Sequence, residues 1–157
     1  MRVGESMRKL RDIMREGFLF AVRKDATVAE AARTMAERNV GIVVVLEDER
    51  LIGVFSERDA VRRVIDKGRE PATTLVGDVM TTDLVVADEN DDYQTGMRTM
   101  DRAGIRHLPV VRNEQIVSML SIRDLLRVDM QRMDEELRFL SEYLYTVPPE
   151  VAQRGRK

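Results

Sequence analysis

The sequence predicts an α+β protein built from two β-α-β-β-α repeats and a C-terminal helix. Three observations support this prediction: an internal sequence repeat, the same order of apolar patterns in both copies, and a heptad-like apolar spacing after the second copy. The length of 157 residues fits two units of about 70 to 80 residues. Because units of that size bury little apolar surface alone, we expect them to share a core.

The repeat emerges when the chain is shifted against itself by 65 positions, which aligns residues 19–62 with 84–127 without a gap. Ten aligned pairs are identical, whereas ordinary amino-acid usage would give roughly three. A slip of one residue extends the match upstream, pairing residues 12–14 with 78–80. The chain is therefore predicted to be a duplication. The identities cluster at Arg33-Thr34-Met35 with Arg98-Thr99-Met100, and at Ser56-x-Arg58-Asp59 with Ser121-x-Arg123-Asp124.

Each copy is predicted to begin with a short strand, at residues 19–22 and 84–87, followed by an amphipathic helix. The helices show apolar residues at i, i+4 and i+7, which form one stripe on a helix surface. Thr27 and Glu30 supply a capping box for the first helix, and Asp92 begins the second helix without an acidic partner. The stripes are Val28, Ala32 and Met35 in the first copy, and Tyr93, Met97 and Met100 in the second.

Two apolar runs follow in each copy and predict a pair of adjacent strands. In the first copy they span 42–46 and 51–55 around a polar turn at 47–50, and in the second they span 107–111 and 116–120 around a turn at 112–115. A helix is expected to open at each Ser-x-Arg-Asp segment. Residues 66–71 combine charge with helix breakers and predict the linker between the copies.

Beyond the repeat, the apolar spacing runs 4, 3, 4, 3, 4 and predicts a helix over residues 126–146 that overlaps the end of the second copy. The helix either folds back over its own domain or pairs with a second copy of the chain. The basic end after Pro148 and Pro149 is predicted to be frayed. The apolar positions are Leu126, Met130, Met133, Leu137, Leu140 and Leu144.

Composition excludes several classes of function. The net charge of -2 provides no basic field for nucleic acid. The absence of cysteine and the single histidine exclude thiolate and multi-histidine metal centres and fit a reducing, cytoplasmic setting. No apolar run approaches the roughly 20 residues that cross a bilayer, and no signal peptide is recognised. Since neither a P-loop, a dinucleotide fingerprint nor a nucleophile elbow is present, we expect no enzyme and no catalytic cofactor.

The repeated Gly/Ser-h-h-Ser-x-x-Asp motif, where h is apolar, resembles that of tandem CBS domains, also called a Bateman module. It stands at residues 53–59 and 118–124, with further similar pieces at 76–80 and 105–111. The resemblance implies a first CBS repeat over residues 10–71 and a second over 76–133, related by pseudo-twofold symmetry. Two departures are serine where threonine is more usual and Ser118 where the family usually has glycine, which would allow a backbone to approach a ligand closely.

The resemblance also implies that adenosine-type ligands such as AMP, ADP, ATP, NAD or S-adenosylmethionine bind in the cleft between the repeats. A strand-to-helix turn presents free N–H groups that suit a phosphate, and a carboxylate suits the donor pair of a ribose. The expected ribose ligands are Asp59 and Asp124. The expected phosphate ligands are Ser56, Ser121, Arg58, Arg123, Arg106 and His107, and the expected base contacts are Phe20, Val22, Val85, Ala87 and Pro109.

Each of these residues also has a purely structural interpretation. Ser-x-x-Asp is a helix-capping box, His107 can be a packed strand-edge residue, and the apolar positions can be core. The motif nevertheless stands twice at the same offset, which favours ligand contact, and capping and binding can coexist.

The sequence therefore predicts a regulatory, energy-sensing module that binds an adenine nucleotide, forms a homodimer and acts on an unidentified protein. The main alternative is a constitutive dimerisation scaffold with empty or vestigial clefts. A nucleic-acid accessory protein and a detached piece of a larger enzyme are weaker alternatives.

Overall fold

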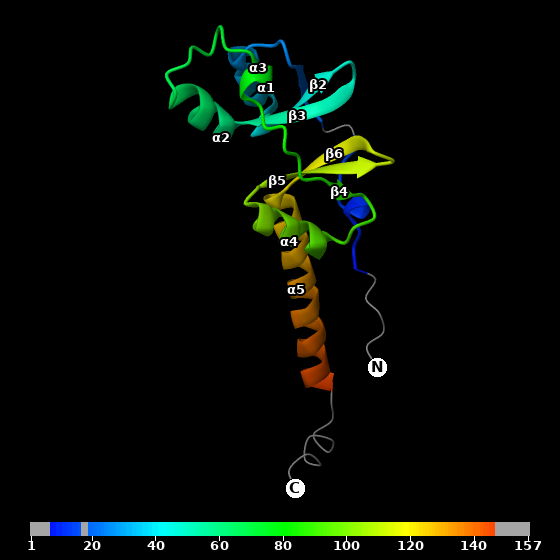
Figure 1. Cartoon of the computed structure of the whole chain (residues 1–157). Helices are drawn as coiled ribbons and strands as arrows, with labels where there is room; N and C mark the ends of the chain where they lie inside the picture. Colours follow the sequence, from blue (N-terminus) through cyan, green and yellow to red (C-terminus); the bar gives the residue numbers. More distant parts are fainter. Residues whose placement is uncertain (1–6, 17–18, 147–157) are drawn as a thin grey trace.

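The computed structural model describes residues 7–16 and 19–146, and in them it contains one three-stranded sheet per repeat (Figure 1). The first repeat comprises β1 (Ala21–Arg23), α1 (Val28–Arg38), β2 (Ile42–Glu47), β3 (Arg50–Ser56) and a helix made of α2 (Glu57–Asp59) and the π-helical η2 (Ala60–Ile65). The second comprises β4 (Ala87–Asp88), α4 (Tyr93–Ala103), β5 (His107–Arg112), β6 (Gln115–Ser121) and α5 (Ile122–Thr146). The predicted α+β fold is confirmed.

Both sheets have the same mixed topology. β1 pairs with β2 in parallel and β2 with β3 antiparallel, and β4, β5 and β6 repeat this order. The hairpin turns are tighter than the four residues expected from the sequence. Asp48 and Glu49 have φ of 47° and 63°, and Asn113 and Glu114 have φ of 49° and 64°. Two-residue turns with positive φ match the twist of antiparallel strands, which explains why the strands extend further into the polar segment.

The two amphipathic helices begin as predicted. The Thr27 side chain accepts from the Glu30 backbone in a capping box, and the Asp92 side chain accepts from the Thr95 backbone without an acidic partner. The inner stripe differs at one position, because Ala31 is buried whereas Ala32 is exposed. Helical residues at i+3 and i+4 both lie close to one face, so the spacing alone does not choose between two adjacent alanines.

Two short helices each pack into the hydrophobic core of the other repeat. η1 (Leu10–Asp12) stands at the N-terminal end of the first repeat but fills the core of the second, where Leu10 is fully buried beside α4 and α5 residues. α3 (Val76–Val79) stands at the N-terminal end of the second repeat but fills the core of the first. Backbone hydrogen bonds fix both segments, from Leu10 N to Asp91 O at 2.9 Å and from Val76 N to Ala26 O at 2.8 Å. Each hydrophobic core is therefore built from both halves of the chain.

The C-terminal helix α5 is continuous with the second repeat. Leu125 and Val128 bury its first turns in the core, after which the helix extends away from the sheets (Figure 1). The heptad-spaced apolar residues of α5, Leu126, Met130, Met133, Leu137, Leu140 and Leu144, form a row that we call the seam. From Met133 at 51% to Leu144 at 75% the outer seam residues are exposed, so in this chain the helix does not fold back over its own domain. None of the helices in the described part of the chain is long and apolar enough to cross a bilayer.

Candidate functional site

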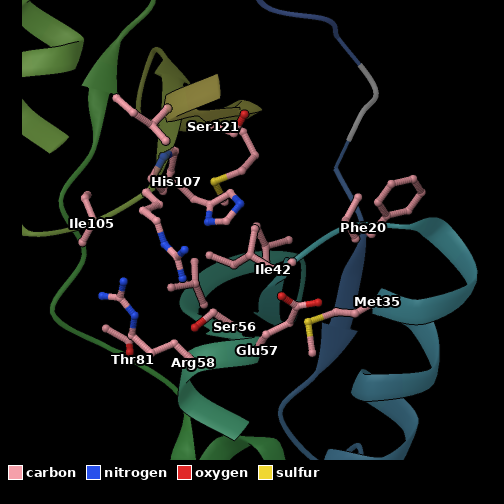
Figure 2. A pocket seen from close by; sticks show the side chains of 18 of the residues that line it. Phe20, Met35, Ile42, Ser56, Glu57, Arg58, Thr81, Ile105, His107 and Ser121 are labelled. Atoms are coloured by element: carbon pink, nitrogen blue, oxygen red, sulfur yellow. The ribbon is translucent and has the colours of Figure 1, made fainter. Parts of the chain in front are cut away.

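A cavity of about 860 Å³ lies where the two repeats face each other. The two Ser-x-Arg-Asp turns open onto it, together with the starts of β2 and β5 and the segment that follows α3. Figure 2 shows Ser56, Glu57 and Arg58 on one side of the cavity and His107 and Ser121 on the other. The fold therefore brings together residues that lie about 65 positions apart in the sequence.

Both turns are built in the same way. β3 ends at Ser56 and β6 ends at Ser121, and each serine caps the helix that follows it. Ser56 N and Oγ each donate to Oδ2 of Asp59 at 3.0 Å, and Ser121 N and Oγ each donate to Oδ2 of Asp124 at 2.8 Å. The capping interpretation of the motif is therefore correct for both copies, and both carboxylates also line the cavity.

Asp59 has further partners, Arg63 in its own repeat and Thr81 in the segment that follows α3. Thr81 Oγ1 donates to Oδ1 and Oδ2 of Asp59 at 3.3 and 3.4 Å, and Arg63 Nε lies 3.7 Å from Oδ1. Arg63 also donates to the carbonyl oxygens of Val79 and Met80, which holds the end of α3 beside this turn. The Asp59 side chain is only 13% exposed as a result.

His107 lies between the two turns. β5 pairs with β6 so that His107 is opposite Ser121, and its ring approaches Gly41 of the first repeat. Burial lowers the pKa of His107 and the neighbouring Arg106 lowers it further, while Glu57 acts in the opposite direction. The imidazole is therefore neutral at pH 7 and can donate one hydrogen bond to a ligand.

The predicted arginines lie at the cavity but differ in their partners. Arg58 crosses to the second repeat and donates to the carbonyl oxygen of Gly104 at 3.3 Å. Arg106 and Arg123 line the cavity with exposed side chains. All the predicted phosphate-contacting residues are therefore brought to one cavity.

The apolar residues expected at the base divide into two groups. Phe20, Val85 and Pro109 line the cavity. Val22 and Ala87 do not line it, because Val22 packs against the core of the first repeat and Ala87 is buried in the core of the second. Val22 and Ala87 lie inside the short strands β1 and β4 and pack on the cores, whereas Phe20 and Val85 precede these strands, so only part of each predicted segment faces the cleft.

Sequence reasoning missed five polar residues of the cavity lining, which are Asn39, Glu57, Thr81, Asp83 and Arg127. Thr81 could have been found, because it follows residues 78–80, which match 12–14 in the repeat shifted by one residue. In that alignment Thr81 corresponds to Arg15. Among the described residues, no group of three or more histidine, cysteine or carboxylate side chains could hold a metal ion.

Gly53 has a role other than the ligand approach expected from the sequence. A Cβ at Gly53 would lie 2.7 Å from Met80 Sδ and 2.9 Å from Thr81 O, so the glycine makes room for the segment after α3. In that space Val54 and Thr81 exchange backbone hydrogen bonds of 3.0 and 2.8 Å. In the second repeat the equivalent residue is Ser118, and its hydroxyl donates a hydrogen bond to the Arg15 carbonyl oxygen at 3.1 Å. The residue at this position thus sets how the neighbouring segment attaches.

We expect Gly53→Ala to destabilise the protein by about 1 to 3 kcal/mol, since a backbone oxygen must move to admit the methyl group. Urea unfolding measures this change. Gly41→Ala is the matched control, because its Cβ would meet only side-chain atoms, the flexible end of Glu57 at 3.3 Å and the His107 ring at 3.6 Å. Equal stability of the two variants would contradict the assigned role of Gly53.

Comparison with known proteins identifies the repeats. The family model described as CBS domain matches residues 10–66 and 76–131. The chain is 35% identical over 125 residues to CBS domain-containing protein CBSX3, mitochondrial, of Arabidopsis thaliana, which covers 76% of this chain and 61% of that protein. The chain thus spans about three fifths of that relative's length.

Three solved structures have the same fold. An uncharacterised conserved protein from Pyrococcus horikoshii superposes with a TM-score of 0.74 at 29% identity, covering 80% of this chain and 95% of that one. The CBS domain pair of protein MJ0100, in complex with 5-methylthioadenosine and S-adenosylmethionine, gives 0.73 at 16% identity and covers 80% and 98%. A hexameric CBS-CP12 protein from bloom-forming cyanobacteria gives 0.67 at 26% identity and covers 76% and 69%.

Proposed function

Because the chain belongs to the CBS domain family as a tandem pair, we propose that it is a regulatory module that binds an adenosine-type ligand between its repeats. The observation that carries the proposal is the convergence of two Ser-x-Arg-Asp turns on one cavity of about 860 Å³. This volume lies within the range of small-molecule sites. The ligands 5-methylthioadenosine and S-adenosylmethionine of the MJ0100 pair, a protein with the same fold, support an adenosyl ligand.

The geometry supports separate roles for the cavity residues. Asp59 and Asp124 accept hydrogen bonds from ribose hydroxyls, since carboxylates at these positions would repel a phosphate. Ser56, Ser121 and His107 donate to phosphate oxygens, assisted by Arg58, Arg106 and Arg123. Phe20, Val85 and Pro109 contact the base. The ligand, one of AMP, ADP, ATP, NAD or S-adenosylmethionine, acts as a regulatory effector of a partner protein and not as a catalytic cofactor.

Mass spectrometry of small molecules released from freshly purified protein tests the proposal. We expect an adenosine-containing compound in amounts comparable with the protein, or, for protein purified empty, saturable binding of one of the five ligands in equilibrium dialysis. The proposal is wrong if no adenosine compound is released and none of the five binds.

The alternative function is a constitutive dimerisation scaffold. The close engagement of Asp59 by Ser56, Thr81 and Arg63 favours it, because these contacts show that the turn can serve the fold alone. A protein that binds no ligand but remains dimeric would support the scaffold. We propose no enzymatic role, since the sequence analysis identified no catalytic residues. The proposed limits of the two repeats are residues 10–71 and 76–133.

A homodimer is part of the proposed function. Val61 and Ile65 are 56% and 65% exposed, and Leu126 and Met130, which stand 65 positions later, are 45% and 67% exposed. The two repeats therefore present the same apolar pair, and the α5 seam continues from the second pair. Exposed apolar surface repeated in this way is typical of an interface between copies. Assembly of a relative into hexamers supports oligomer formation.

We expect Leu137→Glu combined with Leu140→Glu to shift the protein toward monomer in light scattering, because both residues lie in the α5 seam and are 64% and 51% exposed. Gln131→Glu with Ser141→Glu is the matched control, since it adds the same two negative charges at exposed positions of the helix outside the seam. A dimer that survives the seam variant, with α5 still helical by circular dichroism, would contradict a role of the seam.

The remaining expectations from the sequence stay predictions. The partner protein is unidentified, and nucleic acid and membrane binding are not part of the proposal. A cytoplasmic location is proposed from composition, and the mitochondrial location in the relative's name belongs to that protein.

A further inference from the structure

The two halves of the cavity differ in the free acceptors that they offer. Thr81 and Arg63 engage both oxygens of Asp59 in addition to the serine cap. Asp124 receives only the cap on Oδ2, and within residues 7–16 and 19–146 its Oδ1 accepts no hydrogen bond. A ribose can therefore bind Asp124 without displacing a donor of the described residues, whereas at Asp59 it must compete with Thr81.

The difference has a clear origin in the sequence. Arg63 aligns with Val128 in the repeat, and Val128 is buried in the core, where it offers no donor. Thr81 aligns with Arg15, whose backbone carbonyl is held by Ser118. The donor that Arg63 supplies to Asp59 thus has no counterpart at the corresponding position of the second repeat.

The charges that line the two halves also differ. Residues of the first repeat contribute the two carboxylates of Glu57 and Asp59 and one arginine, Arg58, which is hydrogen-bonded to Gly104. Residues of the second repeat contribute the two carboxylates of Asp83 and Asp124 and three arginines. A nucleotide phosphate is therefore attracted to the second repeat and repelled by the first. The three arginines are Arg106, Arg123 and Arg127.

We propose that the cavity contains two unequal half-sites, and that an adenine nucleotide occupies the Asp124 half first. At low concentration one nucleotide binds per chain, with its ribose on Asp124 and its phosphate toward the arginines of the second repeat. In the Asp59 half the hydroxyl of Thr81 occupies the carboxylate, so this half accepts a second ligand only at higher concentration. This inference rests on the proposed function and assigns an order of occupancy within that site.

Isothermal titration with AMP tests the order of occupancy. We expect a first event of one AMP per chain in the wild type, at least tenfold weaker in Asp124→Asn and changed less than twofold in Asp59→Asn. Arg127→Gln removes an exposed charge of the same half without touching the cap, and it should weaken the first event several-fold. Thermal unfolding without AMP checks that each variant is folded. If Asp124→Asn does not fold, the AMP affinity of Arg127→Gln takes its place as the test of the first binding event.

Thr81→Val tests the Asp59 half-site directly, because it keeps the shape of the side chain and removes the hydroxyl that donates to Asp59. We expect the second AMP to bind more tightly in this variant, while the neighbouring exposed Thr82→Val control leaves both events unchanged. Loss of the first event in Asp59→Asn, two equal events in the wild type, or no tightening in Thr81→Val would overturn the inference. Absence of binding by every adenosine-type ligand would instead refute the proposed function.

Discussion

A saturating adenosine-type ligand is expected to raise the Tm of the protein by about 5 to 10 °C. A ligand present at 100 times its Kd adds about 2.7 kcal/mol to the free energy of unfolding, which corresponds to such a shift in a domain of this length. The effect arises because the ribose and phosphate contacts exist only while the two repeats are folded against each other. Differential scanning fluorimetry with AMP, ADP, ATP, NAD and S-adenosylmethionine measures it.

Substitution of both carboxylates, Asp59→Ala with Asp124→Ala, should abolish the shift. Each lost hydrogen bond to a charged acceptor costs about 1.5 to 3 kcal/mol of affinity, and both ribose acceptors are removed. Deoxyadenosine ligands should be weak on the wild type for the same reason. Asp101→Ala, an exposed carboxylate of α4 outside the cavity, is the control and should respond as the wild type does. A normal shift in the double variant would show that the two turns act as helix caps alone.

Leu10→Ala is expected to destabilise the protein by about 2 to 5 kcal/mol. Leu10 stands at the N-terminal end of the first repeat, yet it is fully buried in the core of the second, so its truncation leaves a cavity between α4 and α5. Urea unfolding measures the loss. Hydrogen exchange should show it first in β5 and β6, since the affected core lies under that sheet.

Met7→Ala is the control for this experiment, because Met7 lies in the same N-terminal segment but is 52% exposed. Its effect should stay within about 0.5 kcal/mol. A loss below about 1 kcal/mol for Leu10→Ala, or faster exchange confined to β2 and β3, would contradict the exchange of segments between the repeats.

Much of the architecture followed from local patterns in the sequence. The matching of residues 19–62 with 84–127 predicted two equivalent units, and both sheets have the same topology. The apolar runs predicted the hairpins, although not their turn lengths, because Asp48-Glu49 and Asn113-Glu114 lack the glycine that usually marks a positive-φ pair. Period alone also could not choose between Ala31 and Ala32 on the inner face of α1.

The candidate site was predicted where it depends on the motif itself. Ser56, Asp59, Ser121 and Asp124 were identified from Ser-x-x-Asp, because a cap and its carboxylate lie three residues apart in any chain that forms this turn. Val22 and Ala87 were predicted to contact the base, but in the structure they pack on the cores and do not line the cavity. Whether a strand residue faces the cleft depends on register and on what packs behind the strand.

The sequence by itself determined that two copies of one unit, each with a capped carboxylate, would face one another. Only the tertiary structure decided that the two carboxylates are unlike. The donors that engage Asp59 come from Thr81 and Arg63, which lie 22 and 4 positions away, and the first of these reaches it only because α3 packs into the core of the first repeat. The environment of a side chain depends on segments that the fold brings together, so identical motifs acquired different hydrogen-bonding capacity.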